Sequence, residues 1–513
     1  MSTPADYLRF LSRNGVKLWI DNGQLRYHAR KGVLGPEELA RLQSMKGEIV
    51  AELIQARVSE ADKSIGTDVA CVLEAPVSFQ QRWFLKLLDE YPNWKATLSY
   101  LFHLKGVLDP RALEMGLAGV LHKHSSLRTR IVRTCGAWRQ QIEPSGGFRL
   151  PINQVAGESD AERQQNAPLL IQKAQTQSLD PAAAGLMTAQ LIRLSAQEHF
   201  LVVMTHRLAT DCFGIGQAFR DLWTFYAEAA QQGSSTSLEG STQYRDYSLW
   251  QYNTDEAWRQ KHEAYWNDYL AGAVPLLWRL DECAPPASRN GEGELASLES
   301  SFGETLSARL RELSRQTRIL PALIMLTLYV ACLSIWCKQK DLVVPFLIAG
   351  RAAAHEGVVG CFSHVVYLRV RLRGNESFIE LLKLVSNEYY RVAAFRQDSG
   401  RMAIERPELV RGTLCQWLSW HPADIAGLPT DSPTSQLGLK VENVRCQSLE
   451  ELTNIPPDRV DLEINFFDAA GGISALAIYR TGRFGQDTLR RLMGELRSVA
   501  ERAVKDSGAP IAR

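Results

Sequence analysis

The sequence predicts an α/β protein in which helices flank a parallel or mixed sheet. An apolar run at residues 198–204, with paired valines, is typical of a strand, and residues 217–226 follow it with apolar side chains at helical spacing. The alternation returns later, because residues 322–336 are spaced as a buried helix and residues 342–348 are strand-like. Strands and helices that alternate along the chain predict a layered α/β fold.

Length and composition predict a cytoplasmic protein of two or three packed units. The chain has 513 residues, a net charge of +1 and a pI near 7.6, so nothing drives it toward nucleic acid or membrane. Nine cysteines without framework spacing, and no signal peptide, indicate reduced thiols. No apolar run reaches the ~18 residues that span a bilayer. No Cys/His set has metal spacing, so we predict no metal and no directly bound cofactor.

The first 57 residues are predicted to form a small separate module, followed by a linker at residues 58–75. Residues 16–20 and 24–28 alternate apolar and polar side chains about a turn, which predicts a β-hairpin. Pro36 then opens a helical stretch. The module holds nine Lys/Arg against six Asp/Glu.

Basic side chains gather near the second strand of this hairpin. They lie on it or directly after it, and they are Arg26, His28, Arg30 and Lys31. A short basic strand suits an acidic peptide tail that adds along its edge. The alternative is an ordinary solvated face.

The polar segment from Met204 to Gly214 joins the strand to the helix, which is a common place for reactive side chains. Neighbouring side chains of a strand point to opposite faces, so we expect that His206 and Arg207 do not face one cavity. A guanidinium has no free lone pair, so Arg207 does not accept a proton near neutral pH.

This segment resembles the His-His-x-x-x-Asp-Gly signature of the condensation domains of nonribosomal peptide synthetases, with Arg207 at the second histidine and Cys212 at the glycine. Other stretches resemble further motifs of that family in the same order, namely residues 78–85, 124–130, 244–250 and 359–364. The N-terminal module resembles the TubC-type docking domain of synthetase subunits, through residues 15–18, 24–27 and 31–34.

The resemblance implies a V-shaped pseudo-dimer of two chloramphenicol-acetyltransferase-like lobes, here residues 76–255 and 256–513, after the small α/β docking domain at residues 1–57. It implies an acyltransferase that joins a carrier-bound acyl or peptidyl thioester to an amine, less often a hydroxyl. Phosphopantetheine arms of donor and acceptor carrier proteins present the substrates. The docking domain is implied to bind the C-terminal tail of an upstream synthase, or to pair with a second copy.

The resemblance also implies roles for residues around the signature. His206 and Asp211 shape the loop, and Asp211 pairs with Arg351 from the other lobe. Arg207 stands where the family has its proton acceptor, so it positions substrate, holds a carboxylate or phosphate, or stabilises an oxyanion. Alternatively, Arg207 pairs with Asp211, or it closes the tunnel that in this family has a carrier protein at each end.

Other residues are candidates for supporting roles near the signature. His364 and His421 are candidates to replace the missing base if they face the channel, although a lone histidine is more often a packing residue. Cys212 is interpreted as a packed thiol in preference to a nucleophile. Gly214 supports the loop.

A second class of function stays open, namely a catalytically silent condensation fold kept as a docking and gatekeeping module. The His-Arg-x-x-x-Asp pattern is similar to that of the recruitment domains of glycopeptide synthetases, which bind tailoring oxygenases. Those domains carry a second acidic residue where this chain has Cys212.

Overall fold

Two compact units make up the chain in the computed structural model. One contains residues 1–71 with 352–356, and the other contains residues 72–351 with 357–513. The structure describes residues 16–21, 24–28, 73–183, 185–233, 242–254, 256–278, 293–418, 433–444, 449–453, 456, 459–469 and 471–510.

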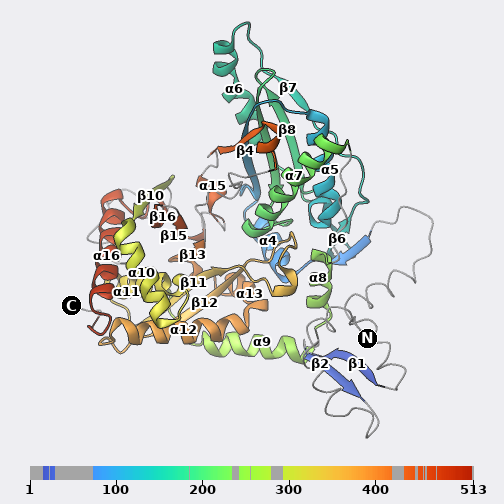
Figure 1. The fold of residues 1–513 in the computed structure, drawn as a ribbon. Helices are drawn as coiled ribbons and strands as arrows, with labels where there is room; N and C mark the ends of the chain where they lie inside the picture. The colour runs from blue at the N-terminus through green and yellow to red at the C-terminus, as the bar shows by residue number, and fades with distance from the viewer. Residues whose placement is uncertain are drawn as a thin grey trace. The chain divides into compact units, whose positions relative to one another are not determined.

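The first unit contains the predicted β-hairpin. Strand β1 (Lys17–Asp21) pairs antiparallel with β2 (Gln24–His28) along its whole length (Figure 1). The helical stretch predicted from Pro36 lies outside the described residues. Of the basic residues proposed for docking, β2 contains Arg26 and His28, and the described ranges do not include Arg30 and Lys31.

A five-stranded sheet lies at the centre of the first half of the second unit. Its order is β14-β4-β9-β8-β7, and each pair is antiparallel except β7–β8. Strand β9 (Glu198–His206) confirms the strand predicted at 198–204, and α7 (Cys212–Gln232) contains the helix predicted at 217–226. The other strands are β4 (Thr97–Lys105), β7 (Ile152–Gln154), β8 (Met187–Arg193) and β14 (Lys440–Val444).

The same half of the unit also contains several helices and a small three-stranded sheet of order β3-β6-β5. Helix α5 packs against α7, where Gly119 lets the helices approach, because a Cβ at this position would lie 2.9 Å from the Phe225 ring. These elements are β3 (Leu73–Pro76), β5 (Thr129–Thr134), β6 (Ala137–Ile142), α4 (Phe79–Glu90), α5 (Pro110–Lys123), α6 (Asp160–Gln175) and α8 (Tyr244–Tyr252). Helix α9 (Glu256–Tyr269) packs instead in the second half, where Trp266 Nε1 donates to the Phe395 carbonyl at 3.0 Å.

A six-stranded mixed sheet lies at the centre of the second half, with the order β10-β16-β15-β13-β11-β12. The pairs β11–β13 and β13–β15 are parallel and the others antiparallel, as the prediction of a parallel or mixed sheet allows. Strand β11 (Asp341–Ile348) is the strand predicted at 342–348. Its partners are β10 (Leu295–Ser301), β12 (His364–Arg371), β13 (Leu414–Leu418), β15 (Leu462–Ala469) and β16 (Gly472–Arg480).

Helix α11 (Pro321–Cys337) is the buried helix predicted at 322–336, and it packs against α12 and α16 beside the mixed sheet (Figure 1). Within the described part of the chain, none of the individual helices combines the length and the hydrophobicity of a membrane span. The remaining helices of this half are α10 (Gly303–Thr317), α12 (Phe378–Ala394), α13 (Gly400–Glu405), α14 (Glu408–Arg411), α15 (Leu449–Leu452) and α16 (Gln486–Lys505).

Strand β14 leaves the second half of the chain and extends the first sheet. It pairs antiparallel with β4, and Lys105 on β4 forms an ion pair of 3.1 Å with Glu442 on β14. Helix α15 then packs beside β4 and β10. The predicted boundary between residues 255 and 256 stays a prediction. Strand β14 comes after this boundary in the sequence but pairs with β4, which comes before it. This pairing brings residues 449–453 to the end of β9.

Candidate active site

The loop between β9 and α7 is fixed by its own sequence. Asp211 is the N-cap of α7, and its Oδ1 accepts a hydrogen bond of 2.8 Å from the Gly214 N–H. Aspartate is among the strongest N-cap residues because it satisfies an N–H that the helix leaves without a partner. A Cβ at Gly214 would lie 2.6 Å from Thr210 Oγ1 and 3.1 Å from Arg351 Nη2, so the loop requires glycine here.

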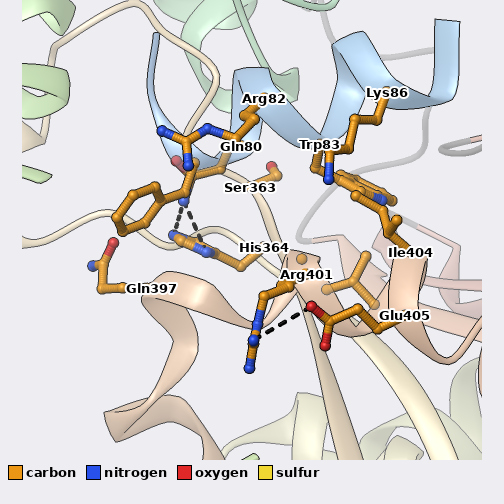
Figure 2. Close-up of a pocket in the computed structure, with 13 residues that line it drawn as sticks. Gln80, Arg82, Trp83, Lys86, Ser363, His364, Gln397, Arg401, Ile404 and Glu405 are labelled. Atoms are coloured by element: carbon orange, nitrogen blue, oxygen red, sulfur yellow. Dashed lines mark hydrogen bonds and ion pairs between the residues drawn. The ribbon is translucent and has the colours of Figure 1, made fainter. Parts of the chain in front are cut away.

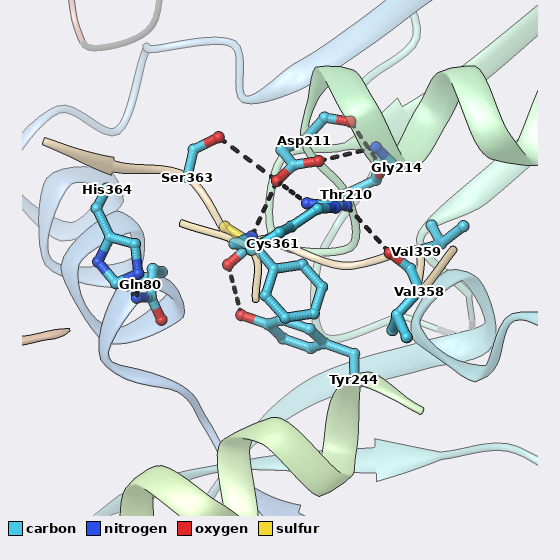
Figure 3. Close-up of polar contacts among 12 residues, drawn as sticks. Gln80, Thr210, Asp211, Gly214, Tyr244, Val358, Val359, Cys361, Ser363 and His364 are labelled. Atoms are coloured by element: carbon cyan, nitrogen blue, oxygen red, sulfur yellow. Dashed lines mark hydrogen bonds and ion pairs between the residues drawn. The ribbon is translucent and has the colours of Figure 1, made fainter. Parts of the chain in front are cut away.

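The second carboxylate oxygen of Asp211 joins the two halves of the unit. It accepts hydrogen bonds from Arg351 Nη1 at 2.7 Å, the Phe362 N–H at 3.1 Å and Ser363 Oγ at 3.4 Å (Figure 3). Arg351 also donates to the Val358 carbonyl at 3.0 Å. The predicted Asp211–Arg351 ion pair is therefore present, with 5% and 14% of the two side chains exposed. The carboxylate is committed to this anchor.

Further motif residues meet behind this anchor. The Tyr244 hydroxyl lies 2.7 Å from Ser78 Oγ and donates to the Cys361 carbonyl at 2.6 Å (Figure 3). A Cβ at Gly360 would lie 2.1 Å from the Tyr244 ring, so glycine is required at this position too. The motif stretches that contain these residues thus support one another beside the β9–α7 loop.

Arg207 is bound to residues 451–453, which follow β14 and lie beside this loop. Its Nη2 donates to the main-chain carbonyls of Glu451 at 2.7 Å and Thr453 at 2.6 Å. Its guanidinium lies 5.7 Å from the centre of the Trp94 ring, and only 8% of the residue is exposed. Burial lowers its pKa from the usual value. Asp211 binds Arg351, and the hydrogen bonds described for Arg207 go to Glu451 and Thr453.

His206 is the last residue of β9, and Arg207 follows it outside the strand. The Nδ1 of His206 accepts a hydrogen bond of 3.1 Å from the Leu208 N–H, and 2% of the residue is exposed. Burial, and then the charge of Arg207, lower the pKa of His206 to about 3. His206 does not line the cavity beside Arg207. Its neutral ring therefore packs within the loop.

A cavity opens beside Arg207 and Asp211 between residues of both halves. The wall is partly apolar, through Trp83, Phe84, Leu98, Leu347, Leu418 and Leu452. The polar and thiol residues that line it are Tyr100, Arg207, Thr210, Asp211, Cys212, Cys361, Ser363, Gln416, Glu451 and Asn465. Polar groups on an apolar wall are typical of a small-molecule site.

Side chains that the sequence interpretation missed line this cavity from the second half of the chain. Glu451 accepts hydrogen bonds from the Ser99 N–H at 3.3 Å and Ser99 Oγ at 2.8 Å. Gln416 on β13 donates to Asn465 on β15. These residues lie more than 200 positions from the signature, in stretches without motif spacing. Only the strand pairing brings them to the site, so no local signal could have identified them.

Cys212 lies at the start of α7 and lines the cavity, close to the apolar side chains of Leu418 and Leu452. Burial, and then the nearby Asp211 carboxylate, raise the pKa of its thiol to about 12. A thiol of this kind stays protonated near neutral pH and is a poor nucleophile. The geometry therefore favours packing over attack for Cys212.

His364 lines a different cavity, beside α4 (Figure 2). Its ring nitrogens lie 2.9 and 2.7 Å from Gln80 Nε2, and the Tyr247 hydroxyl lies 3.3 Å from its Nε2. Burial, and then the charge of Arg396, lower its pKa to about 3. His364 is therefore a buried neutral ring outside the Arg207 cavity. His421 lies outside the described residues.

Two family models match the sequence. The model described as "Condensation domain" covers residues 73–405, and "TubC N-terminal docking domain" covers residues 5–55. The chain is 27% identical over 409 residues to surfactin synthase subunit 1 of Bacillus subtilis, covering 80% of this chain and 11% of that protein. It is 28% identical over 442 residues to isonitrile lipopeptide synthase of Mycobacterium tuberculosis, covering 83% and 17%. The chain spans less than a fifth of either relative.

Solved structures share the fold. The X-domain from teicoplanin biosynthesis superposes with a TM-score of 0.67 at 22% identity, covering 87% of this chain and 98% of that one. The condensation domain of the monacolin K polyketide synthase MokA gives 0.67 at 15%, covering 86% and 100%. The cyclization-docking bidomain of EpoB from Sorangium cellulosum gives 0.63 at 17%, covering 98% and 97%. Likeness at such identities shows the fold alone.

Proposed function

The chain belongs to the condensation-domain family, and we propose that it transfers an acyl or peptidyl group from a carrier thioester to a carrier-bound amine. The predicted family, the TubC-type docking domain and the chloramphenicol-acetyltransferase-like α/β fold are confirmed. The chain spans only a small part of its curated relatives, so the reaction and its partners are proposals.

The observation that supports transfer most directly is the cavity beside the signature loop. It is lined from both halves of the chain, next to the anchor formed by Asp211 and Arg351. Among the described contacts, Arg207 Nε has no hydrogen-bond partner, although the residue is buried and lines the cavity. A buried N–H donor without a partner suits a substrate carbonyl, or the oxyanion that forms from it.

The reaction itself needs no bound metal. The amine nitrogen attacks the thioester carbonyl, a C–N bond forms, and the C–S bond breaks to release the carrier thiol. Arg207 positions the carbonyl and stabilises the negative charge that develops on its oxygen. Holding the two substrates together lowers the barrier by several kcal/mol, up to about 7–11 kcal/mol in the best-oriented cases.

The partners of this reaction are two carrier proteins and an upstream synthase. We propose that both substrates arrive on phosphopantetheine arms, so the chain itself binds no cofactor. The docking domain, matched over residues 5–55, recruits the upstream subunit through its C-terminal tail or forms a homodimer. We place the reaction in the cytoplasm, where such synthetases find carriers and reduced thiols.

A two-carrier transfer assay tests this function. One carrier is loaded with an N-acylated amino acid and the other with a free amino acid, and intact mass follows both. We expect the acyl mass to move from the donor carrier to the acceptor carrier. A panel of loaded pairs that shows no transfer with the wild-type chain, while a condensation domain with the His-His signature turns over its own pair, would contradict the proposal.

A second function, recruitment without catalysis, is supported by the bonds of Arg207. Two main-chain carbonyls hold its guanidinium, which ties residues 451–453 to the loop where the family has a base. Such a tie would keep the fold rigid without chemistry. The X-domain, which shares the fold, is solved in a complex with OxyB from teicoplanin biosynthesis. Stable capture of a tailoring enzyme, together with no transfer between carriers, would favour this function.

A further inference from the structure

The proposed transfer releases one proton from the amine, and the signature loop has no histidine in the cavity to accept it. The acceptor must then be another group that faces the reacting atoms. Among the described lining residues, those with an ionisable side chain are Tyr100, Arg207, Asp211, Cys212, Cys361 and Glu451.

Three kinds of group on this wall are unsuited to accept the proton. Arg207 has no lone pair to offer. Asp211 is committed to Arg351, two N–H groups and Ser363. The pKa values of the Tyr100 hydroxyl and of the Cys212 and Cys361 thiols are raised, chiefly by burial, so these groups stay protonated at neutral pH.

Glu451 remains, and the structure holds it in place from two sides. Ser99 on β4 donates both its N–H and its hydroxyl to Glu451 Oε2, at 3.3 and 2.8 Å. Arg207 binds the Glu451 main-chain carbonyl at 2.7 Å. The same arginine that stands at the position of the family's base therefore fixes the main chain of Glu451, a residue that lines the cavity.

We propose that Glu451 is the proton acceptor of this condensation domain and substitutes for the histidine that Arg207 replaced. This inference rests on the proposed function. As the amine nitrogen bonds to the thioester carbonyl carbon, its proton passes to the Glu451 carboxylate. When the C–S bond breaks, Glu451 returns the proton to the departing thiolate, so charge and atoms balance and the carboxylate is regenerated.

The surroundings of Glu451 tune it for this task. Burial raises its pKa above that of an ordinary carboxyl, whereas the Ser99 hydrogen bonds and the charges of Arg207 and Lys95 lower it. The other titratable groups of the cavity wall are Tyr100, Asp211, Cys212 and Cys361, and β10, which packs beside α15, carries the exposed Glu299. A carboxylate of raised pKa is a stronger base, and it is active at pH values above that pKa.

Glu451→Gln tests the role, because glutamine keeps an oxygen for both Ser99 bonds but accepts no proton. The probes are a donor carrier with an N-acylated amino acid and an acceptor carrier with a free amino acid. We expect transfer to fall about 10²- to 10⁴-fold, as for loss of a general base, with an unchanged melting curve. The matched control is Glu442→Gln on β14, whose carboxylate forms ion pairs outside the cavity and whose loss should leave turnover near wild type.

Three further readouts separate proton transfer from packing. Wild-type turnover should fall as the pH drops through the Glu451 pKa. This acidic limb of the pH–rate profile should disappear in Glu451→Gln. Arg207→Gln removes a nearby positive charge and should move the limb to higher pH. Formate added to Glu451→Ala should restore part of the lost rate, because a small carboxylate enters the vacated space.

The outcomes distinguish this inference from the function on which it rests. No transfer by wild type would overturn both. Transfer that persists in Glu451→Gln would overturn the role of Glu451 alone, and a loss confined to His421→Ala would assign the proton to that histidine. A loss in Glu451→Gln without formate rescue of Glu451→Ala and without a changed pH limb would make Glu451 a packing residue.

Discussion

At Arg207, one guanidinium meets two demands. Its Nη2 donates to two main-chain carbonyls, and its buried Nε has no hydrogen-bond partner among the described contacts, in a residue that lines the cavity. The Nη2 bonds fix residues 451–453, whereas the Nε–H group is proposed to bind substrate. Lysine can reproduce the first, because an ammonium donates three hydrogen bonds, but it lacks the planar fork of N–H groups.

Substitutions at Arg207 should therefore separate stability from turnover. We expect Arg207→Lys to keep most of the thermal stability but to lose about 10²- to 10³-fold in transfer, as for removal of one oxyanion donor. Arg207→Ala should lose both. Loaded carriers and a melting curve measure the two effects. A wild-type rate retained in Arg207→Ala would remove the positioning role, and transfer that appears only in Arg207→His would show a silent domain.

At the scale of elements, the ion pair between Asp211 and Arg351 joins the start of α7 to the segment after β11. Arg351→Ala should strand a carboxylate with only 5% of its side chain exposed, at a cost of about 3–5 kcal/mol in the free energy of unfolding. Urea denaturation measures the loss. The control Arg490→Ala breaks an exposed pair with Asp487 and should cost under about 1 kcal/mol.

A double variant checks the cause. Adding Asp211→Asn to Arg351→Ala removes the stranded charge, so the double variant should be more stable than Arg351→Ala alone. If the double variant is the less stable of the two, the charge of Asp211 is satisfied elsewhere and the anchor is not an ion pair in energetic terms.

Elements with a local signal were predictable from the sequence. Strand β9 and helix α7 follow from a contiguous apolar run and then helical spacing, and Asp211 is a strong N-cap by its chemistry alone. Strand β14 carries no such signal, since its Lys-Val-Glu-Asn-Val sequence is short and polar. It becomes a strand by pairing with β4, and this long-range pairing also brings Glu451 to the site.

The histidines of the site show the same limit, namely that sequence predicts local geometry but not long-range packing. The expectation that His206 and Arg207 do not face one cavity follows from local strand geometry, and Arg207 lines the cavity whereas His206 does not. The placement of His364 does not, because the second cavity and the contact with Gln80 depend on how α4 packs beside the distant strand β12. A sequence position that matches the family's motif therefore does not fix which cavity a side chain faces.

At the scale of the whole molecule, the basic cluster of the docking domain should connect the chain to its upstream partner. Titrating acidic C-terminal tails of candidate synthases into the full chain should give binding that weakens with salt, as the Debye length falls from about 10 Å at 0.1 M to about 3 Å at 1 M. Replacing Arg26 and Lys31 by Gln should weaken it, whereas replacing Arg9 and Arg13 removes the same charge outside the cluster and should not. Equal losses for the two pairs would mean that net charge alone attracts the tail, and salt-independent binding would mean that the strand edge and apolar contacts recognise it.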